Sequence, residues 1–435
     1  MHAASPRSGL LVAAPQSGSG KTLVTLALLR WARRRGLLVA PAKAGPDYID
    51  PAFHAAATGR PSVNLDPYAM RPALIHALAE VDGQPLVVEG MMGLFDGVAD
   101  GTGSAADLAA MLGLPVLLVV DCAKQSHSVA ALVRGFRDHR PGLRFCGLAL
   151  NRVGSARHEA LLRAALRPLD LPILAVLPRR EALVLPERHL GLVQAGETVG
   201  LETFLDRAAD WFGEGADVAA FEMLLAGTPT GGSPASAPTR LPPLGARIAV
   251  ARDEAFAFAY PHLLDGWRAA GADLSTFSPL ADEAPDPSTD AVFLPGGYPE
   301  LHAGRIAVAE GFRAGMIAAR DRGVAIYGEC GGYMVLGDRL ETADGASHPM
   351  LGFLPVATSF KLRRLHLGYR RLRPRPGGPW SGSLVGHEFH YSSIIEEGAG
   401  ERLFDAADAL GDDLGALGLR RGRVSGSFSH VIDLA

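Results

Sequence analysis

Short apolar runs alternate with longer amphipathic stretches through the first half of the chain. The apolar runs that we expect to form strands are 9–13, 37–42, 85–89, 116–121, 147–151 and 173–177. Helical patterns lie between them, including 22–35 and 157–166. Because this rhythm is typical of parallel strands joined by helical crossovers, we predict an α/β domain with a mostly parallel sheet and helices on both faces.

A change of composition then divides the chain. Residues 226–243 read AGTPTGGSPASAPTRLPP, and such a Pro-, Gly- and Ser-rich stretch is typical of a linker. After it a second α/β pattern begins, with expected strands and helices at 247–251, 291–294 and 324–327, and at 260–270 and 306–320. At 435 residues the chain is long for one domain. We therefore predict domains at 1–225 and 244–435, with a linker at 226–243.

Composition and charge exclude several classes of protein. A hydrophobic share of 48% suits sizeable cores, and a net charge of -4 argues against bulk attraction to nucleic acid or to a membrane. No apolar run is long enough to span a bilayer. The first apolar run leads directly into the motif described next, so we interpret it as part of the fold. Three cysteines are too few for a disulfide framework, which favours the reducing cytoplasm.

A phosphate-binding loop is predicted between the first expected strand and the first expected helix. Its residues are Ser17, Gly18, Ser19, Gly20, Lys21 and Thr22. Backbone N–H groups in such a loop bind phosphates, while the lysine reaches the outer phosphate oxygens and the hydroxyl binds Mg²⁺. The usual pattern places a glycine where this chain has Pro15. The alternative is a Gly- and Ser-rich turn that binds nothing.

Carboxylates follow two of the expected strands. Asp47 and Asp50 lie in the sequence GPDYIDP, and Glu89 ends the run at 85–89. Ligands of open α/β sheets gather at the carboxyl ends of strands, and Mg²⁺ prefers oxygen ligands. We therefore expect metal or substrate contacts from these residues, with Asp121 as a weaker candidate. The alternative is that Asp47 and Asp50 only shape a turn.

Cys330 is the candidate nucleophile of the second half. It stands in GECGG, between an expected strand and a stretch that can open a helix. Glycines around a cysteine permit a sharp strand-to-helix turn that exposes the sulfur to substrate. We expect the helix start to lower the pKa of the thiol and to offer N–H groups to an oxyanion. Cys122 and Cys146 lie in or beside expected strands and are interpreted as core residues.

His430 is the candidate base for Cys330, because a histidine from a late loop commonly serves an earlier thiol. The oxyanion donors are predicted to be the N–H groups of Gly297, in the turn PGGYPE, and of Gly331. His387 and His390 lie in GHEFHYSS, a probable strand without the spacing of an HExxH zinc site. We interpret them as structural histidines.

Together these motifs give the chain a family likeness that runs nearly from end to end. It resembles the cobyrinate/hydrogenobyrinate a,c-diamide synthases of cobalamin biosynthesis. Beside the phosphate loop, the likeness rests on KAGPDYIDPAFH (43–54), ATGRPSVNLD (57–66), VVEGMMGLFDG (87–97), LPERHLGLVQAGE (185–197), ARDEAFAFAYP (251–261), LPGGYPEL (294–301), GECGGYM (328–334) and GHEFHYS (386–392). The resemblance implies a phosphate-loop, dethiobiotin-synthetase-like first domain and a class I glutamine amidotransferase domain.

The resemblance also implies residue roles. It implies that Mg²⁺ is held by Thr22, Asp47 and Glu89 and the phosphates by Lys21. It implies that the substrate is placed by Asp50 and Asp96 and that the nucleobase is read by Asn151. It implies that Cys330 is the nucleophile and His430 its base. Class I amidotransferases usually carry a glutamate two residues after the histidine, but this chain has Ile432 there. The nearby Asp433 would lie on the opposite face of a strand.

The activity implied is the ATP- and glutamine-dependent amidation of the a and c acetate side chains of a corrin. We favour metal-free hydrogenobyrinic acid over cobyrinic acid as the substrate. The expected partners are the corrin, ATP and glutamine, with a homodimer as one option for assembly. The alternatives are a cobyric acid synthase that amidates other side chains, a phosphate-loop ATPase with a degenerate amidotransferase domain, and a non-catalytic tetrapyrrole carrier.

Overall fold

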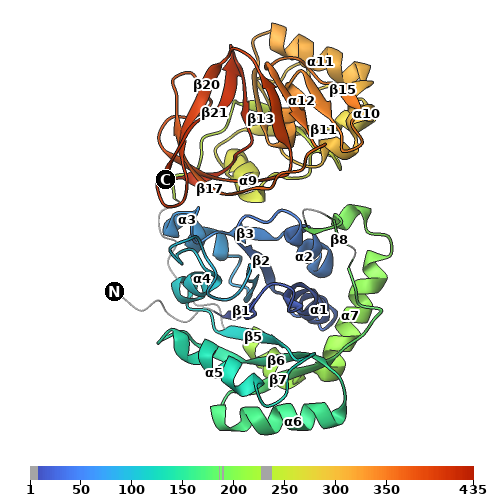
Figure 1. Ribbon diagram of the computed structural model, residues 1–435, viewed down its shortest axis with the longest axis vertical. Coiled ribbons are helices and arrows are strands. Elements are labelled where there is room, and N and C mark those ends of the chain that lie inside the picture. Colours follow the sequence, from blue (N-terminus) through green and yellow to red (C-terminus); the bar gives the residue numbers. More distant parts are fainter. Residues whose placement is uncertain (1–7, 186, 189–190, 227–237) are drawn as a thin grey trace. The chain divides into compact units, whose positions relative to one another are not determined.

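The computed structural model describes residues 8–185, 187–188, 191–226 and 238–435. The chain divides into two compact units, and Figure 1 shows their elements. The first comprises Met1–Tyr68 and Pro72–Pro238, and the second comprises Thr239–Ala435 together with Ala69–Arg71. Each unit is built on an α/β sheet, which confirms the predicted class. In the described part of the chain, no helix is both long enough and apolar enough to cross a membrane.

The described part of the first unit is built on a seven-stranded parallel sheet with the order β3-β2-β4-β1-β5-β6-β7. The strands are β1 (Gly9–Ala13), β2 (Ala40–Ala44), β3 (Val63–Leu65), β4 (Leu86–Glu89), β5 (Val116–Asp121), β6 (Phe145–Val153) and β7 (Ile173–Pro178). A small hairpin adds β8 (Glu187–Arg188) and β9 (Gly191–Leu192). All residues of β1 are buried, as expected for a central parallel strand covered on both faces.

Helices cover both faces of this sheet. They are α1 (Lys21–Arg34), α2 (Asp50–Thr58), α3 (Pro72–Ala79), α4 (Ala105–Leu112), α5 (Val129–His139), α6 (Ala156–Leu166), α7 (Leu201–Gly215) and α8 (Val218–Leu225). Helix α1 packs against α2 and α7, and α5 packs against α6. Figure 1 shows α1 and α7 on one side of the sheet, with α4 and α5 on the other.

The second unit contains a ten-stranded mixed sheet with the order β11-β10-β12-β13-β22-β21-β20-β17-β18-β23 in its described residues. The first five strands of this order are parallel neighbours, and the remaining pairs are antiparallel. The strands are β10 (Arg247–Ala251), β11 (Asp273–Phe277), β12 (Ala291–Leu294), β13 (Ala325–Glu329), β17 (His366–Pro374), β18 (Leu384–His390), β20 (Glu401–Ala407), β21 (Asp413–Arg421), β22 (Val424–Ser427) and β23 (His430–Leu434).

A smaller sheet and a set of helices complete the second unit. The small sheet joins β14 (Arg339–Glu341), β15 (Ser347–Pro349), β16 (Val356–Ser359) and β19 (Ser393–Glu397). The helices are α9 (Pro261–Ala269), α10 (Ala303–Ala307), α11 (Glu310–Asp321) and α12 (Gly331–Leu336). Apolar side chains of α10, α11 and α12 share one core with β10, β12 and β13, and Cys330 lies within that core.

The sequence predicted most parallel strands within a few residues but missed two features. The single helix expected at 306–320 is wrong: α10 and α11 are separate, because Ala309 has a ψ of 86° and leaves the helical conformation. Most of the antiparallel half of the second sheet was not foreseen; the exception is β18, which contains the GHEFH of the predicted strand. Of the predicted linker at 226–243, residues 227–237 lie outside the described residues.

Candidate functional site

The predicted phosphate loop forms the turn between β1 and α1. Helix α1 begins at Lys21, and Gly20 before it has a φ of 88°. A Cβ atom on Gly20 would lie 2.3 Å from Nδ2 of Asn151, so a larger residue would both strain the turn and clash. The hydroxyl of Ser19 donates to the carbonyl of Gln16 at 2.9 Å. The loop therefore has the compact shape that a phosphate cradle requires.

Asn151 supports this loop from β6. Its Nδ2 donates to the Ser19 carbonyl at 2.9 Å, and Asn151 is 2% exposed. The amide thus ties the carboxyl end of β6 to the loop beside β1. A role in reading the nucleobase is not tested by this contact and stays a prediction.

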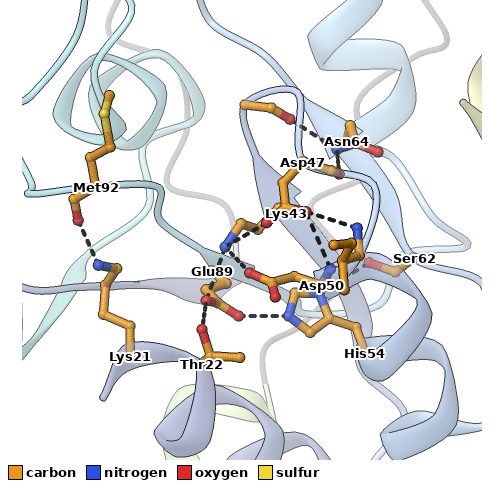
Figure 2. Close-up of polar contacts among 12 residues, drawn as sticks. Lys21, Thr22, Lys43, Asp47, Asp50, His54, Ser62, Asn64, Glu89 and Met92 are labelled. Carbon is orange, nitrogen blue, oxygen red and sulfur yellow. Dashed lines mark hydrogen bonds and ion pairs between the residues drawn. The ribbon is translucent and has the colours of Figure 1, made fainter. Parts of the chain in front are cut away.

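Lys21 and Thr22 point toward the end of β4, as Figure 2 shows. The Lys21 ammonium donates to the Met92 carbonyl at 2.5 Å, and the Thr22 hydroxyl donates to Oε1 of Glu89 at 2.6 Å. Burial lowers the pKa of Lys21, against the opposing effect of Glu89. The structure therefore brings together Thr22 and Glu89, which the sequence placed in one metal site.

Lys43 joins the predicted carboxylates and was missed by the sequence reasoning. Its Nζ lies 3.0 Å from Oε1 of Glu89, contacts Asp50 directly and lies 3.9 Å from Asp47. Burial alone would lower the pKa of Lys43, but Asp50 and Glu89 hold it above its ordinary value. The sequence feature that could have identified Lys43 is a single lysine near the carboxyl end of the buried strand β2.

His54 is a second residue that the sequence reasoning missed. Its Nε2 lies 2.7 Å from Oε2 of Glu89, and its Nδ1 lies 3.3 Å from the Ser62 hydroxyl (Figure 2). His54 and Glu89 are both fully buried. Burial would raise the pKa of Glu89, but Lys43 and His54 hold it well below its usual range. The carboxylate is thus charged and fixed from three sides.

Asp47 and Asp96 are held by local turns. Oδ1 of Asp47 accepts from the Ile49 N–H at 2.8 Å, and Oδ2 of Asp96 accepts from the Gly93 N–H at 2.8 Å. Asn64 also donates to the Asp47 carbonyl at 2.6 Å. Asp47 therefore does shape a turn, as the alternative interpretation held, but its second carboxylate oxygen faces Lys43.

A cavity of about 1200 Å³ opens over the phosphate loop. Residues of the sequence prediction that line it are Gly18, Gly20, Lys21, Thr22, Asp47, Asp50 and Asn151. Its wall also includes Asp121, which forms an ion pair with Arg152 at 2.5 Å. A cavity of this size with convergent polar groups suits a nucleotide-sized ligand. No group of three His, Cys, Asp or Glu side chains with metal-binding geometry occurs among the described residues.

In the second unit, Cys330 forms the predicted turn between β13 and α12. Its φ of 47° and ψ of -102° are unusual for a residue with a side chain. A Cβ atom on Gly332 would lie 1.9 Å from the Leu294 carbonyl, and one on Gly328 would lie 2.8 Å from the Gly332 backbone. The glycines therefore permit the strained conformation that carries the thiol.

His430 lies beside the thiol at the start of β23. A Cβ atom built on Gly296 would lie 3.0 Å from Nε2 of His430 and 3.4 Å from Cβ of Cys330. The side chains of His430 and Cys330 therefore both lie next to Gly296. A Cβ atom on Gly331 would lie 3.0 Å from the Gly297 nitrogen. The structure thus brings together the predicted nucleophile, its base and both predicted oxyanion donors.

The expected lowering of the thiol pKa is wrong. Burial and the Glu300 carboxylate raise the pKa of Cys330, and the opposing hydrogen bond from the Gly331 N–H is weaker. The helix-start argument failed because Cys330 is only 4% exposed and acidic side chains lie around it. The thiol is therefore protonated at neutral pH and needs a base.

Glu329 is the third residue that the sequence reasoning missed. Its Oε2 lies 3.6 Å from Nδ1 of His430, and its Oε1 accepts from the Val431 N–H at 3.0 Å. Asp433 is therefore not the only nearby carboxylate. Asp433 instead accepts from Arg71, at 2.9 Å from Nε and 2.8 Å from a terminal nitrogen.

The remaining candidates are the two histidines of β18 and the two other cysteines. Burial lowers the pKa of His387 and of His390 to about 3, and the His390 ring stacks on Phe428 at 3.9 Å. Burial raises the pKa of the thiols of Cys122 and Cys146 to about 12. His387, His390 and Cys122 are buried and fit the structural roles predicted for them, whereas Cys146, in β6, is only half-buried and is not a core residue.

Family models match both halves of the chain. Residues 10–193 match the CobQ/CobB/MinD/ParA nucleotide binding domain, and residues 247–435 match the CobB/CobQ-like glutamine amidotransferase domain. A hydrogenobyrinate a,c-diamide synthase of Brucella anthropi is 60% identical over 98% of both chains. One of Rhodobacter capsulatus is 53% identical, again over 98% of both chains. The chain belongs to the hydrogenobyrinate a,c-diamide synthase family.

Membership of this family confirms the predicted resemblance. The cavity over the phosphate loop belongs to the nucleotide-binding domain, and Cys330 and His430 belong to the glutamine amidotransferase domain. A protein with both domains is a glutamine-dependent amidating ligase of the cobalamin pathway.

Proposed function

We propose that this protein converts the a and c acetate carboxylates of hydrogenobyrinic acid into amides, using ATP and glutamine. The observation that carries the proposal is the presence of two complete sites in one chain. A nucleotide-sized cavity lies over the phosphate loop, and a buried cysteine lies beside a histidine and two backbone donors. Identity of 60% over 98% of the chain supports the same substrate as the Brucella relative.

The amidotransferase unit supplies ammonia. His430 takes the proton of Cys330, and the sulfur attacks the side-chain amide carbon of glutamine. The N–H groups of Gly297 and Gly331 stabilise the oxyanion that forms. The C–N bond then breaks, His430 returns the proton to the leaving ammonia, and a thioester remains. Water activated by His430 hydrolyses the thioester and releases glutamate.

The nucleotide-binding unit activates the substrate carboxylate. A carboxylate does not react with ammonia directly, because oxide is a poor leaving group. Transfer of the γ-phosphoryl group of ATP to a carboxylate oxygen gives an acyl phosphate and ADP. Ammonia then attacks the acyl carbon and phosphate leaves, which forms the amide. Lys21 would bind the phosphates during the transfer, and Asp50 and Asp96 would help to place the corrin.

Mg²⁺ is the metal that the site residues suit best. Thr22, Asp47 and Glu89 offer oxygen donors, and the Thr22 hydroxyl lies 2.6 Å from Glu89. Lys43 lies within hydrogen-bond distance of Glu89 and Asp50 and balances part of their negative charge. When bound with ATP, Mg²⁺ would neutralise phosphate charge. Ser17, Gly18, Ser19 and Gly20 would cradle the phosphates, and Asn151 would lie near the nucleobase.

Product mass spectrometry tests the substrate. The protein is incubated with ATP, glutamine and either hydrogenobyrinic or cobyrinic acid. We expect two carboxyl-to-amide conversions, faster on the metal-free ring. Conversion at other side chains would indicate the cobyric acid synthase alternative. Failure to consume glutamine with product formation would favour a phosphate-loop ATPase or a carrier.

A further inference from the structure

A buried carboxylate faces the side of the His430 ring that is turned away from the thiol. Glu329 ends β13 and immediately precedes Cys330. Its Oε2 lies 3.6 Å from Nδ1 of His430, and both side chains are 2% exposed. The opposite ring nitrogen, Nε2, would lie 3.0 Å from a Cβ atom built on Gly296, and Cβ of Cys330 would lie 3.4 Å from the same point. The order along this line is thus carboxylate, imidazole and thiol.

The second oxygen of Glu329 fixes the backbone that carries the histidine. Oε1 accepts from the Val431 N–H at 3.0 Å, and Val431 directly follows His430. The Cys330 N–H in turn donates to the Ser427 carbonyl at 2.8 Å, which ties β13 to β22. One carboxylate therefore contacts both the ring and the main chain of the base.

Two other acidic residues of this unit, Glu388 and Asp433, have partners of their own. Glu388, on β18, pairs with Arg370 at 2.7 Å and accepts from the Ser429 hydroxyl at 3.0 Å. Asp433 accepts from Arg71. In the residues that the structure describes, no lysine or arginine forms an ion pair with Glu329. Its carboxylate faces His430 and, on the same face of β13, the hydroxyl of Tyr327.

We propose that Glu329 is the positioning residue of His430, in place of the carboxylate that class I amidotransferases usually carry where this chain has Ile432. The inference rests on the proposed glutaminase function. Glu329 accepts from the Nδ1 proton, which leaves Nε2 as the acceptor for the thiol proton. It also stabilises the imidazolium that forms when Cys330 gives up its proton. A separation of 3.6 Å exceeds a standard hydrogen bond, but such contacts often shorten when substrate binds.

Substitution of Glu329 by Gln tests this role. The amide keeps the size of the side chain but presents a donor or a neutral acceptor to Nδ1. We expect the kcat of glutamine hydrolysis to fall by on the order of 100-fold with little change of KM. We also expect the acid limb of the pH profile of kcat/KM to move to lower pH, because the imidazolium loses its counter-charge. Glu329→Asp, which restores the charge, should recover part of the rate.

Two controls separate this inference from the proposed function. Asp433→Asn removes a carboxylate that Arg71 holds, and should change kcat by less than about threefold. Ammonia-dependent amide synthesis should be unchanged in Glu329→Gln, because the nucleotide site lies in the other unit. Urea denaturation of this variant shows whether the second unit, which carries Glu329, still folds. Cys330→Ala should abolish glutamine hydrolysis; if it does not, the proposed function is wrong.

With Cys330→Ala inactive, three results would overturn the positioning role alone. One is a Glu329→Gln kcat within about threefold of wild type. Another is a lower kcat with an unmoved pH profile, which indicates packing only. The third is an effect of Asp433→Asn equal to that of Glu329→Gln. If Glu329→Gln does not fold, Glu329→Asp is measured instead. A pH profile of kcat/KM identical to that of the wild type, together with a lower kcat, would then overturn the positioning role.

Discussion

At the scale of single residues, burial governs the reactivity of Cys330. Burial and Glu300 raise the pKa of this thiol, so it stays protonated at neutral pH. We expect iodoacetamide to alkylate Cys330 on the order of tenfold more slowly than free cysteine at neutral pH. The rate should still rise through about pH 9, above the ordinary thiol pKa. Mass spectrometry of the peptide that contains Cys330 measures this rate, and a plateau near neutral pH would contradict the account.

Glu89 and Asp47 are the carboxylates proposed to bind Mg²⁺. Replacing either by Ala should lower amide synthesis by on the order of 100-fold, with glutamine and with ammonia alike, because both routes use the same activated carboxylate. Labelling of Cys330 by a glutamine analogue is the control and should persist, since that site is separate. Ammonia-dependent synthesis that survives in both variants would rule out the proposed metal role.

The sequence predicted the candidate site residues better than the residues that contact them. Cys330 and Glu89 are recognisable because Cys330 directly follows a buried strand and Glu89 ends one. Lys43, His54 and Glu329 act through partners that lie far along the chain or on a neighbouring strand, so sequence spacing does not reveal those partners. For Lys43 and Glu329 the signal was a charged residue in an apolar strand, whereas His54 lies in helix α2. The partners of all three could be found only in the folded chain.

At the scale of elements, the turn from β1 into α1 depends on Gly20. An alanine at position 20 would have to adopt a φ of 88°, and its Cβ would lie 2.3 Å from Nδ2 of Asn151. We expect Gly20→Ala to weaken ATP binding by at least about tenfold, because strain and the clash distort the loop. Gly36→Ala is the matched control: its φ is 72°, but nothing lies within 4 Å of the new Cβ. Calorimetry measures both variants, and equal affinities would contradict this account.

The hydrophobic pattern of the sequence is sufficient to predict some of the strands but not all of them. The predicted bounds of β1, β5, β10 and β12 agree with the structure, because continuous buried runs mark parallel strands. The antiparallel strands β17, β20 and β21 were missed because most of their residues are exposed or half-buried. Strand β21, for example, has one buried residue in nine. Pairing with neighbours, and not a local pattern, makes such segments strands.

At the scale of the whole molecule, Ala69–Arg71 belongs to the second unit although the segment lies in the first half of the chain. Arg71 holds Asp433, whose side chain is 1% exposed. Arg71→Ala should lower the free energy of unfolding of the second unit by about 2 kcal/mol, because a buried carboxylate loses its partner. Urea denaturation measures the loss.

The double variant Arg71→Ala with Asp433→Asn is the control for this pair. It removes the uncompensated charge and should recover part of the lost stability. If the double variant is no more stable than Arg71→Ala alone, the ion pair is not the reason that this segment belongs to the second unit.

The central claim is that glutamine cleaved at Cys330 supplies the ammonia for an ATP-dependent amidation. The most direct measurement is the rate of amide formation by Cys330→Ala with glutamine and with a high concentration of ammonium salt. The account predicts no synthesis from glutamine and an undiminished rate from ammonia, since the nucleotide site is intact. Normal use of glutamine by this variant, or loss of synthesis from both nitrogen sources in a folded protein, would contradict it.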